Sequence, residues 1–255
     1  SNTNLEGHWE MDENSGLVAG DSSGNSRNGA ISGASWVTGK VGSALSFDGV
    51  DDEVIATGYK GILGSTSRTI AAWIKTSSAG AIAYWGENAT GKKSALRLRS
   101  SNPNRGALRF EISGGNIYGT TDLRDNQWHH VCAVLPDGAT NVNQVLLYVD
   151  GQLETISSTT PGTINTASLD DFKIGNDDNN RYFNGLIDEV RLYSRALSIE
   201  EINDLPGFSN AIANLNELKT EFRIDGGPWT IAESNGSLTG DFNAATVSQD
   251  SVSGS

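Results

Sequence analysis

The side chains in this sequence best suited to binding chemistry are short oxygen-bearing residues gathered in one glycine-containing loop. The run Asp21-Ser-Ser-Gly-Asn25 is followed closely by Asn28. Hard cations such as calcium prefer oxygen ligands, and a loop of this kind can turn carbonyl groups inward beside a carboxylate. The same run also suits an Asx-type turn, in which Asp21 accepts hydrogen bonds from backbone N–H groups without an ion. The spacing alone leaves both interpretations open.

Two other groups of acidic residues are candidates for binding. Asn176-Asp-Asp-Asn-Asn-Arg181 offers adjacent short polar side chains that could ligate calcium or contact a sugar, although such a run is more often a solvated loop. Asp48, Asp51 and Asp52 form the other group, and the turn at Gly49 between them favours a structural role.

Candidates for catalysis are few. Retaining glycosidases place carboxylates close together, and alternate residues of one strand share a face. Glu10-Met-Asp12 begins such a pattern in the expected first strand, but Asn14 stands where the next carboxylate is needed and Glu13 falls on the opposite face. The three histidines lack zinc-site spacing, and Cys132 lies in an apolar run that predicts a buried, structural thiol. We therefore expect no enzymatic activity.

Sugar-binding sites combine an aromatic ring, which covers the apolar face of the sugar, with planar polar groups that bond its hydroxyls. Basic and aromatic residues on the exposed faces of expected strands, and the polar residues at one loop end, meet this description. The candidates on strand faces or loops are Tyr84, Trp85, Arg97, Arg99, Arg109 and Tyr118, and those at the loop end are Asp177, Asp178 and Asn179.

Short alternating runs separated by turns must position these residues. Ala95–Arg99 and Ala107–Ile112 both alternate apolar and charged residues, as a strand with one buried face does. Asp150-Gly151 between two such runs predicts a type I′ hairpin. More than ten expected strands indicate an all-β fold, a sandwich or a barrel. Ser198 followed by Glu201 is a capping box that predicts one short helix near residue 200.

The character of the sequence changes after Gly207. We expect a β-domain over residues 1–207 and a C-terminal extension over residues 208–255, which either packs on the domain or contacts a partner. Within the extension, Ile224–Ile231 resembles a small hairpin and the residues beyond it are polar.

Charge and composition limit the setting and the partners. The formal net charge of −13 disfavours nucleic acid, and no apolar stretch approaches the ~20 residues needed to insert in a membrane. A single cysteine allows no intramolecular disulfide, so a metal ion is the other common means of stabilising a loop-rich extracellular domain. No signal segment opens the chain, which is consistent with a mature product or an excised domain.

Several motifs occur in a fixed order along the chain: His8–Glu13, Gly20–Asn25, Gly42–Gly49, Ile70–Ile74, Trp128–Val131, Leu147–Gly151 and Asn184–Tyr193. With these motifs the chain resembles the concanavalin A-like lectin/glucanase superfamily, specifically the bacterial laminin-G-like (LamG) domains. The resemblance implies a two-sheet antiparallel jelly-roll β-sandwich. It also implies a calcium site formed by Asp21 and Asp188 with oxygens around Asn25 and Asn28.

The leading hypothesis is therefore a secreted or cell-surface, calcium-stabilised module that binds a glycan or a cell-surface partner. The acidic chain suggests a neutral or weakly charged glycan. The alternative is a structural domain of a surface adhesin or filament, which forms homo-oligomers or joins flanking domains through residues 208–255. An endo-acting glycosidase or polysaccharide lyase is the least favoured function.

Overall fold

The computed structural model describes residues 2–208 of the chain. The predictions made for the C-terminal extension, including the hairpin at Ile224–Ile231, lie outside these residues. Across the part that the structure describes, no helix has the length and apolar character needed to cross a membrane.

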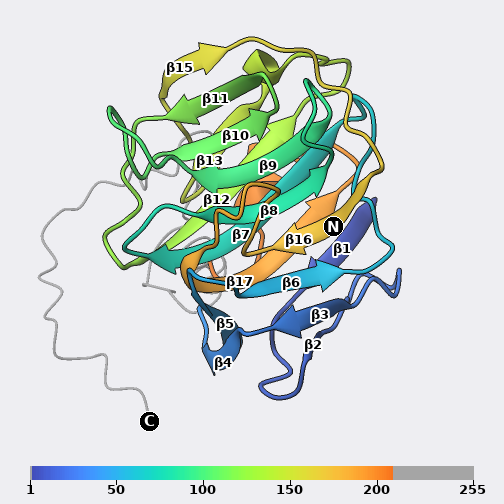
Figure 1. Cartoon of the computed structure of the whole chain (residues 1–255), viewed down its shortest axis with the longest axis vertical. Coiled ribbons are helices and arrows are strands. Elements are labelled where there is room, and N and C mark those ends of the chain that lie inside the picture. The colour runs from blue at the N-terminus through green and yellow to red at the C-terminus, as the bar shows by residue number, and fades with distance from the viewer. Residues whose placement is uncertain (1, 209–255) are drawn as a thin grey trace, which may run out of the picture. The chain divides into compact units, whose positions relative to one another are not determined.

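Two antiparallel sheets form the domain, and the predicted jelly-roll β-sandwich is confirmed (Figure 1). Sheet A runs in the order β14 (Gln152–Leu153), β13 (Leu146–Val149), β12 (Trp128–Leu135), β7 (Arg68–Thr76), β17 (Asn184–Tyr193), β5 (Ser43–Asp48) and β4 (Ser35–Thr38), with β1 (Leu5–Trp9) also paired to β17. Sheet B runs in the order β15 (Ile156–Thr160), β11 (Gly115–Gly119), β10 (Leu108–Ile112), β9 (Lys93–Leu98), β8 (Ala81–Gly86), β16 (Asp170–Ile174), β6 (Glu53–Ala56), β3 (Gly29–Ser32) and β2 (Val18–Ala19). From top to bottom, Figure 1 shows the strands of sheet B in this order.

The main core lies between the two sheets and contains large aromatic rings. Trp9 of sheet A stacks on Phe172 of sheet B with ring centroids 4.7 Å apart. Trp85 of β8 approaches the same Phe172 ring at 5.6 Å. Burial of such rings is the main favourable term that holds the sheets together.

The predicted hairpin and helix are both present. Asp150 and Gly151 have φ angles of 49° and 74°, as a type I′ turn requires, and they connect β13 to β14. Helix α1 (Ile199–Asn203) begins at a reciprocal capping box between Ser198 and Glu201. A 3₁₀ turn, η1 (Val142–Gln144), precedes β13.

Helix α1 covers an apolar cluster on the outer face of sheet A. Ile202 is fully buried there against Cys132, Val134 and Tyr148. Burial raises the pKa of the Cys132 thiol far above its ordinary value, which keeps the thiol protonated. The predicted burial of Cys132 is confirmed.

Strand β17 connects three neighbours in sheet A. Its first half pairs with β5 and its second half with β1, while β7 runs along its other side. The register shifts between Asp188 and Arg191, where Glu189 adopts a left-handed φ of 53°. This bulge lies where the partner strand changes from β5 to β1.

Candidate functional site

The alternation predicted for β9 and β10 places charged residues on the outer face of sheet B. Arg97 on β9 stands opposite Arg109 on β10, which in turn stands opposite Tyr118 on β11. Leu96 and Phe110, each adjacent in sequence to one of these arginines, belong to the core. The outer-face cluster, as used below, comprises three groups of residues. Lys93, Arg97, Arg109, Glu111 and Tyr118 come from sheet B, and Arg99 directly follows β9. Asp177, Asp178, Asn179 and Arg181 come from the loop between β16 and β17.

Glu111 is the centre of the outer-face cluster. Its Oε1 accepts from Lys93 Nζ at 2.9 Å and from Arg181 Nη2 at 3.2 Å. Its Oε2 accepts from Arg97 Nη2 at 2.6 Å and lies 2.8 Å from Arg109 Nη2 in an ion pair. Burial alone would raise the pKa of Glu111, but the charges of Arg97 and Arg109 hold this pKa well below its ordinary value. One carboxylate is therefore shared by four cations.

The loop between β16 and β17 lies over the middle of the cluster. Asp177 is 1% exposed, and its Oδ2 accepts from Arg181 Nε at 2.6 Å. Asp178 Oδ1 lies 3.4 Å from Lys93 Nζ, whereas its Oδ2 is buried without a hydrogen-bond partner. Asn179 is exposed, and its backbone N–H donates to Asp177. The structure thus brings these three predicted ligand-binding residues to the same face as Arg97.

Arg99 and Tyr118 form the end of the cluster beyond this loop. The Arg99 guanidinium lies 4.1 Å from the centre of the Tyr118 ring, and its Nε donates to the carbonyls of Ser101 and Pro103. The neighbouring Arg109 keeps 16% of its side chain exposed, and its Nε is buried without a partner. This end offers planar hydrogen-bond donors beside an aromatic ring, the groups expected of a sugar site.

Sequence reasoning missed three members of the cluster. Glu111 follows Arg109 by two residues and Lys93 precedes Arg97 by four, so the alternation of β9 and β10 already placed both on the outer face. Arg181 comes from a loop, where no periodicity indicates which way a side chain points.

The prediction that Trp85 contacts a glycan is wrong. The side chain has no exposed surface, and its Nε1 donates to the Ile62 carbonyl at 2.9 Å in the core. Tyr84 stands opposite Ala95 on the outer face, and alternation therefore turns Trp85 inward.

The predicted calcium ligands around Asp21 make the hydrogen bonds of a turn. Asp21 Oδ1 accepts from the backbone N–H groups of His8 and Ser23, and Oδ2 accepts from that of Arg27. Asn28 Oδ1 accepts from the Asp21 N–H at 2.9 Å, and Asn25 donates to the Leu5 carbonyl at 3.0 Å. These contacts are those of the Asx-turn interpretation.

Asp188, the other predicted calcium ligand, is fully buried at the bulge of β17. Its Oδ2 accepts from the backbone N–H groups of Lys40 and Val41, and its Oδ1 has no hydrogen-bond partner. Burial, which outweighs these two hydrogen bonds, raises the pKa of Asp188 to about 7. The described contacts give Asp21 and Asp188 separate partners, and an ion shared by the two stays a prediction.

The third acidic group brings its carboxylates together. Oxygen atoms of Asp48, Asp51 and Asp52 lie within 4.8 Å of one another. Asp48 Oδ1 accepts from the Val50 N–H at 2.7 Å, and Asp52 Oδ2 accepts from the Asp48 N–H at 2.8 Å. These hydrogen bonds close the turn around Gly49, which is consistent with the structural role expected there.

The acidic run after β1 lacks the geometry expected of a strand. Strand β1 ends at Trp9, and Met11 has a left-handed φ of 60°, so the placement of Glu10-Met-Asp12 in the first strand is wrong. Asp12 accepts from the Ser43 N–H at 2.7 Å and Glu13 from the Gly20 N–H at 2.7 Å. Both carboxylates hold loops in place.

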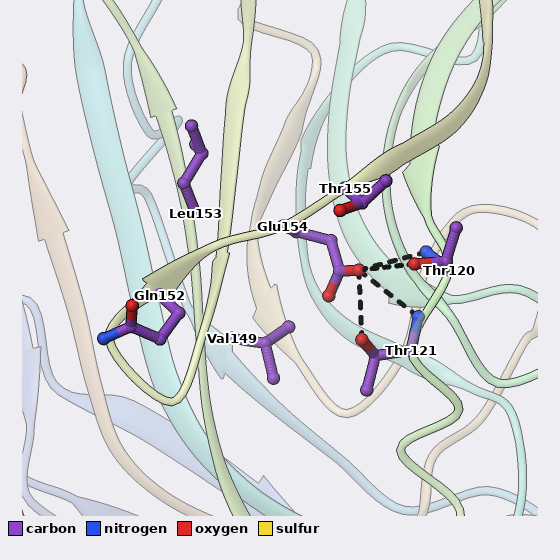
Figure 2. Close-up of a pocket in the computed structure, with 7 residues that line it drawn as sticks. All are labelled: Thr120, Thr121, Val149, Gln152, Leu153, Glu154 and Thr155. Atoms are coloured by element: carbon purple, nitrogen blue, oxygen red, sulfur yellow. Dashed lines mark hydrogen bonds between the residues drawn. The ribbon is translucent and has the colours of Figure 1, made fainter.

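A small hollow of about 200 Å³ lies where the chain crosses from β14 in sheet A to β15 in sheet B (Figure 2). Glu154 Oε1 accepts four hydrogen bonds there, from the N–H and hydroxyl groups of Thr120 and Thr121. Val149, Gln152, Leu153 and Thr155 complete its lining, which includes no aromatic ring and no cation. The hollow therefore offers a sugar fewer kinds of contact than the outer-face cluster does.

Comparison with known protein families identifies the fold family. A model described as the concanavalin A-like lectin/glucanases superfamily matches residues 48–203, more than half of the chain. A search of curated proteins finds no match.

Solved structures similar to this chain include carbohydrate-related and toxin domains. Domain 4 of AbnA, a GH43 extracellular arabinanase from Geobacillus stearothermophilus solved with arabinotriose, is 22% identical with a TM-score of 0.62, over 78% of this chain and 97% of that one. The binding domain of Paraclostridial Mosquitocidal Protein 1 is 15% identical with a TM-score of 0.56, over 79% of this chain and 51% of that one. Trypanosoma rangeli sialidase is 17% identical with a TM-score of 0.55, over 81% of this chain and 33% of that one. At these identities the likeness concerns the fold.

Proposed function

The chain belongs to the concanavalin A-like lectin/glucanases superfamily, and from this membership we propose that it is an extracellular carbohydrate-binding domain without catalytic activity. The observation that carries the proposal is the outer-face cluster of sheet B. Three neighbouring strands and one loop there bring together guanidinium, amide and carboxylate groups beside an aromatic ring. The arabinotriose bound to domain 4 of the arabinanase adds support, because it occurs on the same fold.

The binding mode follows from the accessible end of the cluster. A sugar ring lies beside Tyr118, which is 9% exposed and which Arg99 covers on one face. Arg109 and the exposed Asn179 take hydroxyl groups of the neighbouring sugar units. The proposal assigns no catalytic pair, since Asp12 and Glu13 are each occupied by a backbone N–H group.

A glycan array with the wild-type protein and two tyrosine variants tests this proposal. Tyr118→Ala removes the aromatic ring of the cluster, and we expect binding to weaken about tenfold or more, since such a ring contributes on the order of 1–2 kcal/mol. Tyr148→Ala is the matched control, because Tyr148 has similar exposure (8% against 9%) but lies on the outer face of sheet A. Equal binding by the folded fractions of both variants would contradict the proposed face, and turnover of any oligosaccharide would contradict the absence of catalysis.

The predicted stabilisation by calcium is tested by measuring the melting temperature of the same proteins before and after chelation. If an ion is held by Asp188 through its unpartnered Oδ1, chelation lowers the melting temperature, because a ligand of the folded state stabilises it. An unchanged melting temperature after chelation would instead support the hydrogen-bonded turns as the complete arrangement.

One observation favours the alternative, a self-associating structural domain. Edge strand β15 exposes all five of its residues, and Leu153 and Ile156 nearby are 61% and 39% exposed. Exposed sheet edges can add a strand from a second chain. If light scattering shows association that depends on protein concentration, and no glycan on the array is bound, this function would be favoured over sugar binding.

A further inference from the structure

The outer-face cluster has more positive than negative charge. Its cations are Lys93, Arg97, Arg99, Arg109 and Arg181, and its carboxylates are Glu111, Asp177 and Asp178. Asp170 lies further along the sheet, beside Gly86 of β8, and is bound by the Tyr84 hydroxyl at 2.5 Å. The net charge of the cluster is thus positive, whereas the whole chain carries a net charge of −13.

The positive charge that is not balanced by a carboxylate lies at the end of the cluster formed by Arg99 and Arg109. Arg99 makes no ion pair with a carboxylate among residues 2–208, and its Nε donates only to carbonyl oxygens. Arg109 reaches one carboxylate oxygen, Glu111 Oε2, which also accepts from Arg97. The Nε of Arg109 is buried with no partner at all. A buried donor without a partner is costly and is therefore uncommon unless something else binds it.

The electrostatics of Arg109 agree with an uncompensated charge. Burial lowers the pKa of Arg109 to about 10, and repulsion from Arg97 contributes to the lowering. The acidic residues elsewhere on the chain act weakly here, because charges more than about 8 Å away in solvent are largely screened at physiological ionic strength.

We propose that the saccharide bound at this end carries an anionic group, a carboxylate or a sulfate, which pairs with Arg99 and Arg109. The inference rests on the proposed carbohydrate-binding function and sharpens its ligand class. A guanidinium presents parallel N–H donors that match both kinds of oxyanion, and such charge-assisted hydrogen bonds are about twice as strong as neutral ones.

Calorimetric titration with four oligosaccharides of equal length tests the inference. They are an oligogalacturonate, its methyl ester, a sulfated galactan fragment and a neutral galactan fragment. We expect at least one anionic member to bind about tenfold more tightly than its neutral counterpart, as one additional charge-assisted contact implies. The carboxylate and sulfate arms show which anion is preferred. We also expect the preference to shrink at high salt.

Two arginine variants and one control locate the effect. Arg99→Gln removes a cation that holds no carboxylate, so the fold is expected to persist, and Arg109→Gln removes the one with the unpartnered Nε. Each should lower the preference for the anionic ligand severalfold. Lys75→Gln on β7 of sheet A removes one charge from the other sheet and should leave the preference unchanged.

The outcomes distinguish a failure of this inference from a failure of the proposed carbohydrate-binding function. Equal affinity for anionic and neutral oligosaccharides, or a preference that survives in both arginine variants, would overturn the inference and leave carbohydrate binding intact. Binding to no member of either pair would overturn the inference, and the glycan array would then decide whether carbohydrate binding is overturned as well.

Discussion

The two outer faces of the sandwich are built from strands of the same kind, yet they are covered in different ways. On sheet A, helix α1 covers an apolar cluster that includes Tyr148, Cys132 and Ile202. On sheet B, the loop between β16 and β17 covers a network of charges around Glu111. Apolar burial stabilises a fold directly, whereas a buried ion pair often contributes little because each charge loses its hydration. The comparison indicates that the cover of sheet A contributes directly to stability, and it is consistent with the recognition role that we propose for sheet B.

The largest effect is expected from removing the centre of the charged face. Glu111→Gln leaves Arg97 buried without its carboxylate and Lys93 with Asp178 alone, which should cost about 3–5 kcal/mol of unfolding free energy. Chemical denaturation measures the loss. Glu10→Gln is the matched control, because Glu10 is 44% exposed on its side chain, and its effect should stay within about 0.5 kcal/mol. A loss for Glu111→Gln no larger than that of the control would show that the network is not buried as described.

A smaller effect is expected on the apolar face. Ile202→Ala removes buried methyl groups beneath helix α1 and should lower the unfolding free energy by about 2 kcal/mol, at the low end for such truncations because the helix is short. Ile202→Val, which retains most of the packing, should cost about 1 kcal/mol. Glycan binding by the folded protein should be unchanged in both variants. Weaker binding in them would contradict the separation of roles between the faces.

The smallest effect concerns a histidine contact on sheet A. His129 Nδ1 lies 2.8 Å from Asp150 and its Nε2 lies 3.1 Å from Asp125, and the hydrogen bond with Asp150 raises the pKa of His129. The stabilisation is fully present below the ordinary pKa of about 6.5 and is lost as the pH rises through the raised value. Because the partners are solvent-exposed, we expect less than about 1 kcal/mol.

Thermal unfolding followed between weakly acidic and weakly alkaline pH checks this contact. His129→Gln should flatten the decline in stability above the ordinary histidine pKa. Because the pKa of His130 is instead lowered to about 3 by burial, that histidine is uncharged throughout the range and serves as the internal comparison. A decline that persists in His129→Gln would assign the titration to another group.

Most of the fold could be predicted from local patterns. Period-two alternation identified β9 and β10, the Asp150-Gly151 turn identified its hairpin, and the capping box at Ser198 identified helix α1. These features depend on neighbours in sequence, so a sequence displays them.

The site was predicted only in part, because it depends on contacts between distant segments. Arg97 was placed on an outer face from alternation, and Tyr118 was named only as a candidate on an exposed strand face or loop. The approach of Arg181 to Glu111 joins a loop to a strand 70 residues away. The prediction that Trp85 contacts a glycan was wrong for a related reason. Its position in an alternating strand did not show which of the two faces would be covered by sheet A.

The position of β17 in the middle of sheet A has a consequence for the synthesis of the protein. Its residues 184–193 pair with β5, β7 and β1, all made much earlier on the ribosome. Until they emerge, β5 and β7 have no strand between them, and their apolar residues Leu45 and Ile74 lack the Ile187 that joins them across the sheet. Pairings between distant segments close slowly and leave apolar surface exposed to other chains. The nascent domain therefore remains open until nearly all of residues 1–193 have been made, and a chain released before that point cannot complete the sandwich.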